Sequence, residues 1–227
     1  MNTLRSSLIA AALAAAAGYA AQARAEIFLT ASDGVTMVSA NDSTSAGTAS
    51  YNGTIGDFTT SIETGIGFPA IGAPSDPALD LISFDAATGT AGGTLTVSLS
   101  ETGFTTTTES KLFLSDITGN YSYSNATMST YFDTTDTPFG TGTLLASGLL
   151  DNQESLLSVP PITGPYSLTE IVTLTAGANA WASIDSSIVD TPEPGSLPLL
   201  GAGLLALALL GLRSAMTRAR RSVALLG

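Results

Sequence analysis

Carboxylates are the only abundant side chains in this sequence that could carry acid–base or metal chemistry. The chain of 227 residues has 19 Asp and Glu residues against 7 Lys and Arg residues, and it has neither His nor Cys. The missing His removes the commonest general base, and the missing Cys removes thiol nucleophiles, thiolate metal ligands and disulfides. What remains is the chemistry of paired carboxylates and of oxygen-ligated cations.

Calcium is the cation that these carboxylates would favour. Acidic residues cluster near expected turns, where oxygen ligands can converge, although no cluster matches the D-x-[DN]-x-[DN]-G loop. We name Asp133, Asp136, Asp151 and Glu154 as candidate ligands of a structural calcium ion, and Asp76, Asp80 and Asp85 form a further cluster. The alternative is that the aspartates form turns and accept hydrogen bonds from backbone amides. We expect no other cofactor.

Catalysis by a carboxylate pair is the competing hypothesis. A glycosidase holds two carboxyl groups about 5–9.5 Å apart, and the sequence selects no pair among its acidic residues. Aromatic residues, which commonly line glycan-cleaving clefts, make up only 7% of the chain. Ser110 and Lys111 are neighbours, so on a strand they point to opposite faces and form no catalytic dyad. We therefore expect a non-catalytic protein, with a carboxylate-dependent hydrolase as the alternative.

Two further patterns could bind ligands. Tyr121, Tyr123, Tyr131 and Trp181 could form a platform for stacking sugar rings, but cross-strand aromatic pairs and a core tryptophan are the commoner arrangement in a sandwich. The four threonines at 105–108 would alternate between the two faces of a strand, so they form no flat array for ice binding.

The elements that must position these residues are β-strands. Between about 26 and 185, short β-branched and aromatic runs alternate with Gly, Ser, Asn, Asp and Pro clusters, and helical periodicity is absent. The pattern predicts an all-β fold, an antiparallel and jelly-roll-like β-sandwich, because a β-solenoid should show a repeat and none is found. Strands are predicted at 27–30, 35–39, 57–62, 79–84, 94–100, 111–115, 120–126, 128–132, 142–147, 168–175 and 180–188. We expect residues 186–191 to form a tether.

The N-terminus has the pattern of a secretory signal peptide. Arg5 supplies the positive region, residues 8–17 are apolar, and Ala23 and Ala25 stand at the −3 and −1 positions before Glu26. The apolar run is too short for a retained anchor, which takes about 20 residues. We expect residues 1–25 to be a helical signal that is removed on export.

The C-terminus has a three-part pattern. A Pro-containing segment at 191–196 is followed by an apolar run at 197–212 and by a basic cluster at 213–221, which contains Arg213, Arg218, Arg220 and Arg221. The apolar run predicts a single transmembrane helix, and the arginines predict that its end stays in the cytoplasm. A buried core helix is the alternative, but an all-round apolar helix ending in four arginines has no polar face for water.

Pro192, Glu193, Pro194 and Gly195, with the apolar run and the arginines, resemble the PEP-CTERM sorting signal over 192–221. The resemblance implies a Gram-negative bacterium that makes exopolysaccharide or biofilm matrix. It implies recognition by a membrane-embedded exosortase and the secretion machinery, removal of the tail near the motif, and a passage from the inner membrane to the cell surface or matrix. The family usually ends soon after its arginines, whereas this chain continues through 222–227.

The uneven distribution of charge supports this organisation. All but one of the 19 acidic residues lie between Glu26 and Asp190, where Lys111 is the only basic residue, which gives this part a net charge of −17. A charge of that sign argues against nucleic acid as a partner. We expect an exported structural or adhesive sandwich associated with exopolysaccharide, and the alternative is a secreted hydrolase of matrix polysaccharide.

Overall fold

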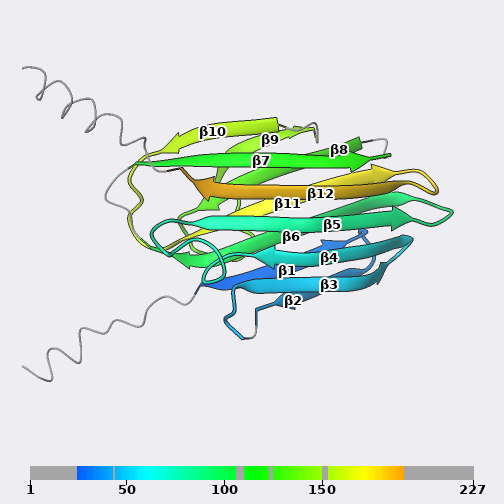
Figure 1. The fold of residues 1–227 in the computed structure, drawn as a ribbon, viewed down its shortest axis with the longest axis horizontal. Coiled ribbons are helices and arrows are strands. Elements are labelled where there is room, and N and C mark those ends of the chain that lie inside the picture. The colour runs from blue at the N-terminus through cyan, green and yellow to red at the C-terminus, as the bar shows by residue number, and fades with distance from the viewer. Residues whose placement is uncertain (1–24, 43, 106–109, 123–124, 150–152, 192–227) are drawn as a thin grey trace, which may run out of the picture. The chain divides into compact units, whose positions relative to one another are not determined.

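A computed structural model describes residues 25–42, 44–105, 110–122, 125–149 and 153–191. Twelve strands and no helix make up this part of the chain (Figure 1). Their bounds are β1 Glu26–Ser32, β2 Met37–Asn41, β3 Thr48–Ile55, β4 Phe58–Ile66, β5 Ala78–Thr88, β6 Gly93–Phe104, β7 Lys111–Tyr121, β8 Asn125–Asp133, β9 Thr143–Leu149, β10 Gln153–Val159, β11 Tyr166–Ala176 and β12 Trp181–Asp190.

The strands form two antiparallel six-stranded sheets. Sheet A has the order β2-β1-β6-β11-β8-β9, and sheet B, which faces the viewer in Figure 1, has the order β10-β7-β12-β5-β4-β3. The chain crosses between the sheets after β2, β5, β6, β7, β9, β10 and β11, so neighbouring strands within a sheet are mostly distant in sequence. The predicted all-β antiparallel class is therefore confirmed, and the jelly-roll-like connection stays a prediction.

Alternation along each strand places one apolar face between the sheets. In β6, Leu95, Val97 and Leu99 are fully buried, whereas Thr96 and Ser98 between them are partly exposed. The same period of two operates in β1 and in the second half of β11, from Glu170 onward, whereas the first residues of β11 are all buried. Polar bonds also join the sheets across the core, because the hydroxyls of Ser115 and Thr130 lie 2.8 Å apart.

Residues 186–190 are not a tether, which corrects the predicted boundary. They continue β12, which pairs with β7 as far as Asp190. The register between β12 and β5 shifts between Ile184 and Ser186, but the alternation of β12 continues unbroken, and its next inward position holds a serine. Because Ser186 donates a hydrogen bond to Glu170 on the opposite sheet, this polar residue is satisfied inside the core.

Several predicted strand boundaries were wrong. The structure adds β3 and β10, which were not predicted, and the predicted strand 120–126 is divided between the end of β7 and the start of β8. Asn52-Gly53 and Thr118-Gly119-Asn120, whose residue types are typical of turns, lie inside β3 and β7. At Gly119 the backbone of the neighbouring strand approaches closely, and an added Cβ would lie 2.8 Å from the carbonyl oxygen of Ser183. A glycine therefore fits at this position inside the strand.

The terminal predictions fall outside the described residues. Ala23 and the residues before it, the motif from Pro192 to Gly195, and Arg213, Arg218, Arg220 and Arg221 all lie there. Ala25, the first described residue, is buried. Thr191 is the last described residue, and its amide donates to the carbonyl of Leu112. Within the described part, no helix has the length and apolarity needed to cross a membrane.

Candidate functional site

Trp181 is on the surface, which corrects the expectation that it belongs to the sandwich core. It is the first residue of β12, and 49% of it is exposed. The turn before it is fixed by Thr88, whose hydroxyl accepts from the amide of Ala180 at 2.8 Å and donates to the carbonyl of Gly177 at 2.8 Å. Ser122 then accepts from the Trp181 amide at 2.9 Å. The position of the indole is therefore set by its own turn and by two neighbouring strands.

An open groove of about 490 Å³ lies beside this indole on the outer face of sheet B. Opposite Trp181 on β5 is Ala87, and opposite Ala87 on β4 is Thr59, both of which are exposed. Because alanine is small, it leaves the side of the indole open along this row. The groove is lined by Asn52, Thr59, Thr60, Ser61, Asp85, Ala86, Ala87, Trp181, Ala182 and Ser183.

The second row of the groove is polar across four strands. Ser183 on β12 pairs with Asp85 on β5, Asp85 pairs with Ser61 on β4, and Ser61 pairs with Asn52 on β3. Within the row, the Asn52 amide donates to the Ser61 hydroxyl at 3.5 Å, whereas the Asp85 carboxylate has no hydrogen-bond partner among the described residues. Its oxygens are therefore free to accept hydrogen bonds from a ligand.

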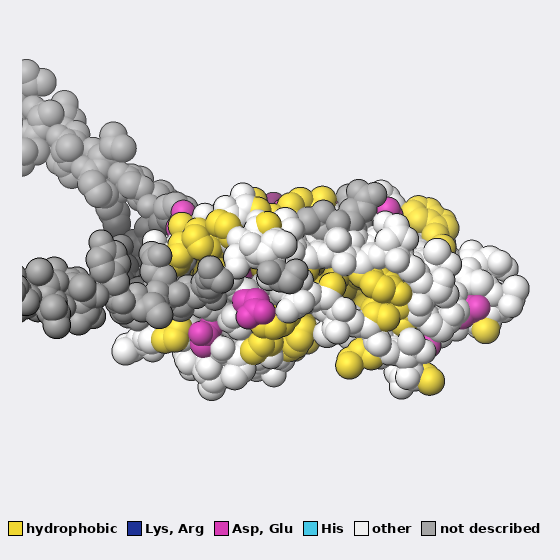
Figure 2. Space-filling view, turned by 90° about the horizontal axis from the view of Figure 1, so that it is seen from below, with side chains coloured by type: hydrophobic (Ala, Val, Ile, Leu, Met, Phe, Trp, Pro, Cys, Tyr) yellow, Lys and Arg dark blue, Asp and Glu magenta, His cyan; other side chains and the backbone are white. Residues whose placement is uncertain are grey.

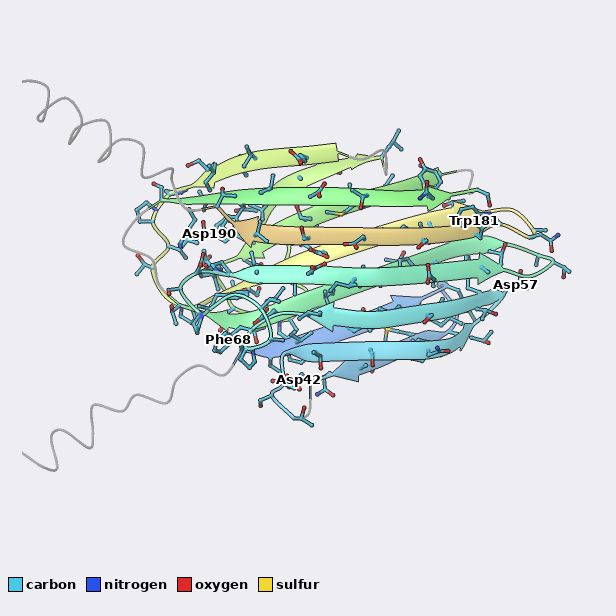
Figure 3. All side chains as sticks on the ribbon, viewed as in Figure 1. Asp42, Asp57, Phe68, Trp181 and Asp190 are labelled. Carbon is cyan, nitrogen blue, oxygen red and sulfur yellow. The ribbon has the colours of Figure 1, made fainter. Side chains whose placement is uncertain are left out.

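Trp181, which borders the groove, and Asp190, which pairs with the basic residue of the sandwich, lie at opposite ends of β12 (Figure 3). Lys111, at the start of β7, forms an ion pair with Asp190 and also donates to the carbonyl of Ser75 at 2.8 Å. The side chains of Lys111 and Asp190 are only 17% and 4% exposed. The ammonium group of Lys111 is thus paired with Asp190 and does not neutralise the acidic residues near the groove.

The outer face of sheet B also carries acids beyond the groove. Asp80 and Asp185 lie on the adjacent strands β5 and β12, and burial together with the Asp185 charge raises the pKa of Asp80 to about 6. Seen from the side on which β2 and β3 lie, the surface is mainly uncharged, with scattered hydrophobic and acidic side chains (Figure 2).

The candidate calcium ligands are distributed as follows. At the end of β8, Asp133 Oδ1 accepts from the amide and the hydroxyl of Thr135, both at 2.7 Å, and these bonds are the first causes that lower the pKa of Asp133. Asp136 Oδ1 accepts from the Gly103 amide at 2.8 Å. Asp151 lies outside the described residues, and Glu154 is exposed on β10.

No group of three or more acidic residues is arranged to hold a metal ion in the described ranges. At Asp133 and Asp136 the structure thus shows the alternative arrangement, in which aspartates accept backbone amide bonds. Of the other predicted aromatics, neither Tyr121 nor Tyr131 joins Trp181 in a platform. Tyr121 ends β7 opposite Ala182, Tyr131 lies in sheet A, and Tyr123 and threonines 106–108 are outside the described residues.

Two buried carboxyl groups were not among the predicted site residues. Glu101 and Glu170 lie on the adjacent strands β6 and β11, and both are at most 1% exposed. Burial raises the pKa of Glu101 to about 9, and it raises the pKa of Glu170 well above its usual value. The signal that could have found them is an acidic residue at an inward position of an alternating strand. They lie inside the core, away from the surface groove.

A second cavity is small. It has a volume of about 40 Å³ and lies near the edge strands β9 and β10, where it is lined by residues that include Met128, Leu149 and Ser155. Because one water molecule occupies about 30 Å³ in the liquid, this cavity has no room for a sugar ring.

The comparisons with known proteins give a distant likeness of fold. No family model matches the chain, and no curated protein matches it. One similar solved structure is TmCBM61 in complex with β-1,4-galactotriose, with a TM-score of 0.30 and 10% identity, over 62% of this chain and 92% of that chain. Another is the enzymatically active domain of tailspike protein 4 of bacteriophage CBA120, with a TM-score of 0.27 and 13% identity, over 58% of this chain and 19% of that chain. At these TM-scores neither likeness says anything about ligand or activity.

Proposed function

We propose that this chain is an exported, non-catalytic surface or matrix protein that binds exopolysaccharide through the groove beside Trp181. The observation that carries the proposal is a half-exposed indole on a polar sheet face, with a carboxylate in the adjacent row, Asp85, that has no hydrogen-bond partner among the described residues. A buried tryptophan would serve packing, whereas an indole held open by Ala87 offers its flat surface to a ligand.

The groove has the two kinds of contact that a sugar needs. A pyranose ring has an apolar C–H face, which packs on an aromatic ring, and a rim of hydroxyls, which need hydrogen-bond partners. Asp85 accepts, and Ser183 and Asn52 both donate and accept. Because these groups lie on paired strands and not on a loop, the groove is held in shape without a ligand.

The number of carboxylates supports binding without hydrolysis. Among the described residues that line the groove, Asp85 is the one titratable residue. Glycoside hydrolysis normally uses two carboxyl groups on opposite sides of the scissile bond. The buried pair Glu101 and Glu170 cannot serve instead, since both are inaccessible to a polymer.

The position of the groove suits a protein that is presented on a surface. Asp190 ends β12 one residue before Thr191, and β12 places Trp181 at its other end, about 30 Å away at about 3.3 Å per residue. We propose that the residues after Thr191 act as a PEP-CTERM signal that exosortase removes. Its loss would leave all twelve strands complete.

The binding test uses the mature chain, residues 26–191, and the exopolysaccharide of the producing bacterium. The wild-type protein is expected to sediment with the polymer, and Trp181→Ala is expected to bind at least about tenfold less. Leu156→Ala is the matched control, because Leu156 is 59% exposed on the same sheet but outside the groove. Equal binding by the two variants would contradict binding in the groove. Release of reducing ends from the polymer would indicate the hydrolase instead.

The sorting test is independent of the first. Mass spectrometry of the extracellular protein from a host with an exosortase should find a chain that begins near Glu26 and lacks residues 197–221. Retention of those residues in the mature protein would contradict the sorting proposal and indicate a permanent anchor.

A further inference from the structure

We infer that the glycan bound beside Trp181 carries free amino groups, as a polymer of incompletely N-acetylated amino sugars does. This inference rests on the proposed function and names the chemical class of its ligand. The observations that carry it are the Asp85 carboxylate in the groove and the lack of any free cation on the sandwich between residues 26 and 190.

Anionic polysaccharides do not fit this face. Lys111 is the only basic residue between positions 26 and 190, and it is held by Asp190 at the far end of β12 from the groove. A uronic acid or sulfated sugar placed on the indole would therefore meet Asp85 with no counter-charge. Like charges brought together at an interface are repelled, so such a polymer is disfavoured.

Asp85 is placed to contact a substituent of a sugar stacked on Trp181. Trp181 pairs with Ala87, so Asp85, two residues before Ala87 on β5, is the diagonal neighbour of Trp181 on the same face. Diagonal neighbours across antiparallel strands have their Cα atoms about 7–8 Å apart, which long side chains can span. An amine on the ring edge, or on the next sugar, would lie within reach of the carboxylate.

The electrostatics of the surrounding face favour a cation over a neutral glycan. An ammonium-to-carboxylate hydrogen bond is about twice as strong as a bond between neutral groups. Asp185, two residues beyond Ser183 on β12, is exposed, Asp80 lies beside it on β5, and no basic residue is available to pair with them. Successive amino groups along a polymer would thus meet further carboxylates after the first.

The only tryptophan of the chain makes the test direct, because intrinsic tryptophan fluorescence reports on the groove alone. Three tetrasaccharides of glucosamine, N-acetylglucosamine and mannuronate are titrated into the mature chain at physiological salt, without divalent cations. The expected order of affinity is glucosamine first, at least about tenfold tighter than its N-acetylated form, with no binding of mannuronate.

Two variants distinguish specific binding of the amino groups at Asp85 from a general attraction between a polycation and an acidic protein. Asp85→Asn should remove the preference for the amino form while keeping binding of the N-acetylated form. Glu154→Gln makes the same change in net charge on the same sheet outside the groove, and it should retain the preference.

Equal affinity for the amino and N-acetylated forms, or equal weakening by both variants, would overturn the inference and leave the proposed function standing. Binding of mannuronate would also overturn the inference alone. If the three tetrasaccharides and the producer's own polymer all fail to bind, the proposed function falls as well.

Discussion

Ser186 on β12 donates a hydrogen bond of 2.9 Å to Oε2 of Glu170 on β11, across the interior between the two sheets. Glu170 is 1% exposed and its other carboxyl oxygen has no partner among the described residues. A buried carboxyl group in this setting stays protonated, because ionisation without a counter-charge is unfavourable in the core. The core therefore contains a group that opposes folding as the solution becomes basic.

Stability should fall as the pH rises above about 4.5. The pKa values of Glu170 and Glu101 are raised by burial, so between the unfolded value of 4.5 and the folded values the native state binds more protons than the unfolded chain. Glu101, whose folded pKa is about 9, then lowers the free energy of unfolding by about 1.4 kcal/mol per pH unit, on the order of 3 kcal/mol by pH 7, and Glu170 acts in the same direction. Urea unfolding at pH 4.5, 7 and 8.5 measures the slope.

The variant Glu170→Gln tests whether the buried carboxyl group of Glu170 contributes to this pH dependence of stability. An amide can keep the bond to Ser186 and does not ionise, so this variant should flatten the pH slope and raise stability at pH 8.5. Glu154→Gln, at an exposed position, serves as the control and should leave the slope unchanged. A slope that stays the same in Glu170→Gln would show that the buried carboxyl is not its source.

The Lys111–Asp190 ion pair should hold the end of β12. Lys111→Met leaves the nearly buried Asp190 carboxylate without its counter-charge, and removal of one partner from such a pair costs about 3–5 kcal/mol when the pair is fully buried. Because Lys111 is partly exposed, we expect a smaller loss of roughly 1–3 kcal/mol. The double variant Lys111→Met with Asp190→Leu should recover most of the lost stability, as measured by urea unfolding. Additive losses in the double variant would contradict this coupling.

Gly47 should tolerate no side chain. Its φ is 74°, and an added Cβ would lie 2.6 Å from the Gly67 carbonyl oxygen and 2.7 Å from the Ala70 amide nitrogen. Gly47→Ala therefore combines backbone strain with a clash against neighbouring backbone, and we expect a loss of about 2–4 kcal/mol. Gly177→Ala is the matched control, since nothing lies within 4 Å of its added Cβ. Thermal unfolding of the two variants makes the comparison, and equal melting temperatures would refute the close packing of the Gly47 loop.

Asp57 should contribute to stability at the end of the sandwich near Trp181 (Figure 3). Its Oδ2 accepts from the amides of Ala91 at 3.0 Å and Gly92 at 2.8 Å, which joins the β3–β4 turn to the β5–β6 turn. Asp57→Ala should lower stability by about 1–2 kcal/mol, whereas Asp57→Asn, which keeps an acceptor oxygen, should lose less. Hydrogen exchange would localise the effect, with faster exchange expected at Ala91 and Gly92.

The alternation of side chains was sufficient to predict the central strands. Leu95, Val97 and Leu99 in β6 and Leu168, Val172 and Leu174 in β11 all lie in the core, because a period of two needs no information beyond the strand itself. The strands β3 and β10 were missed because polar residues and glycine make up most of the first and the start of the second, so the apolar signal is weak. β12 was cut short because its inward serine looks like a surface residue until Glu170 lies opposite it.

The sequence by itself determined the class of fold and the imbalance of charge, because strand alternation and the count of ionisable groups are local properties. It could not place Trp181 on the outer face or bring Asp85 and Ser183 beside it, since the groove joins strands β3, β4, β5 and β12, which are up to 130 residues apart in the chain. That assembly depends on strand order and register, which result from packing of the whole core. The same packing decided that two glutamates lie inside the sandwich and that the single lysine is committed to Asp190.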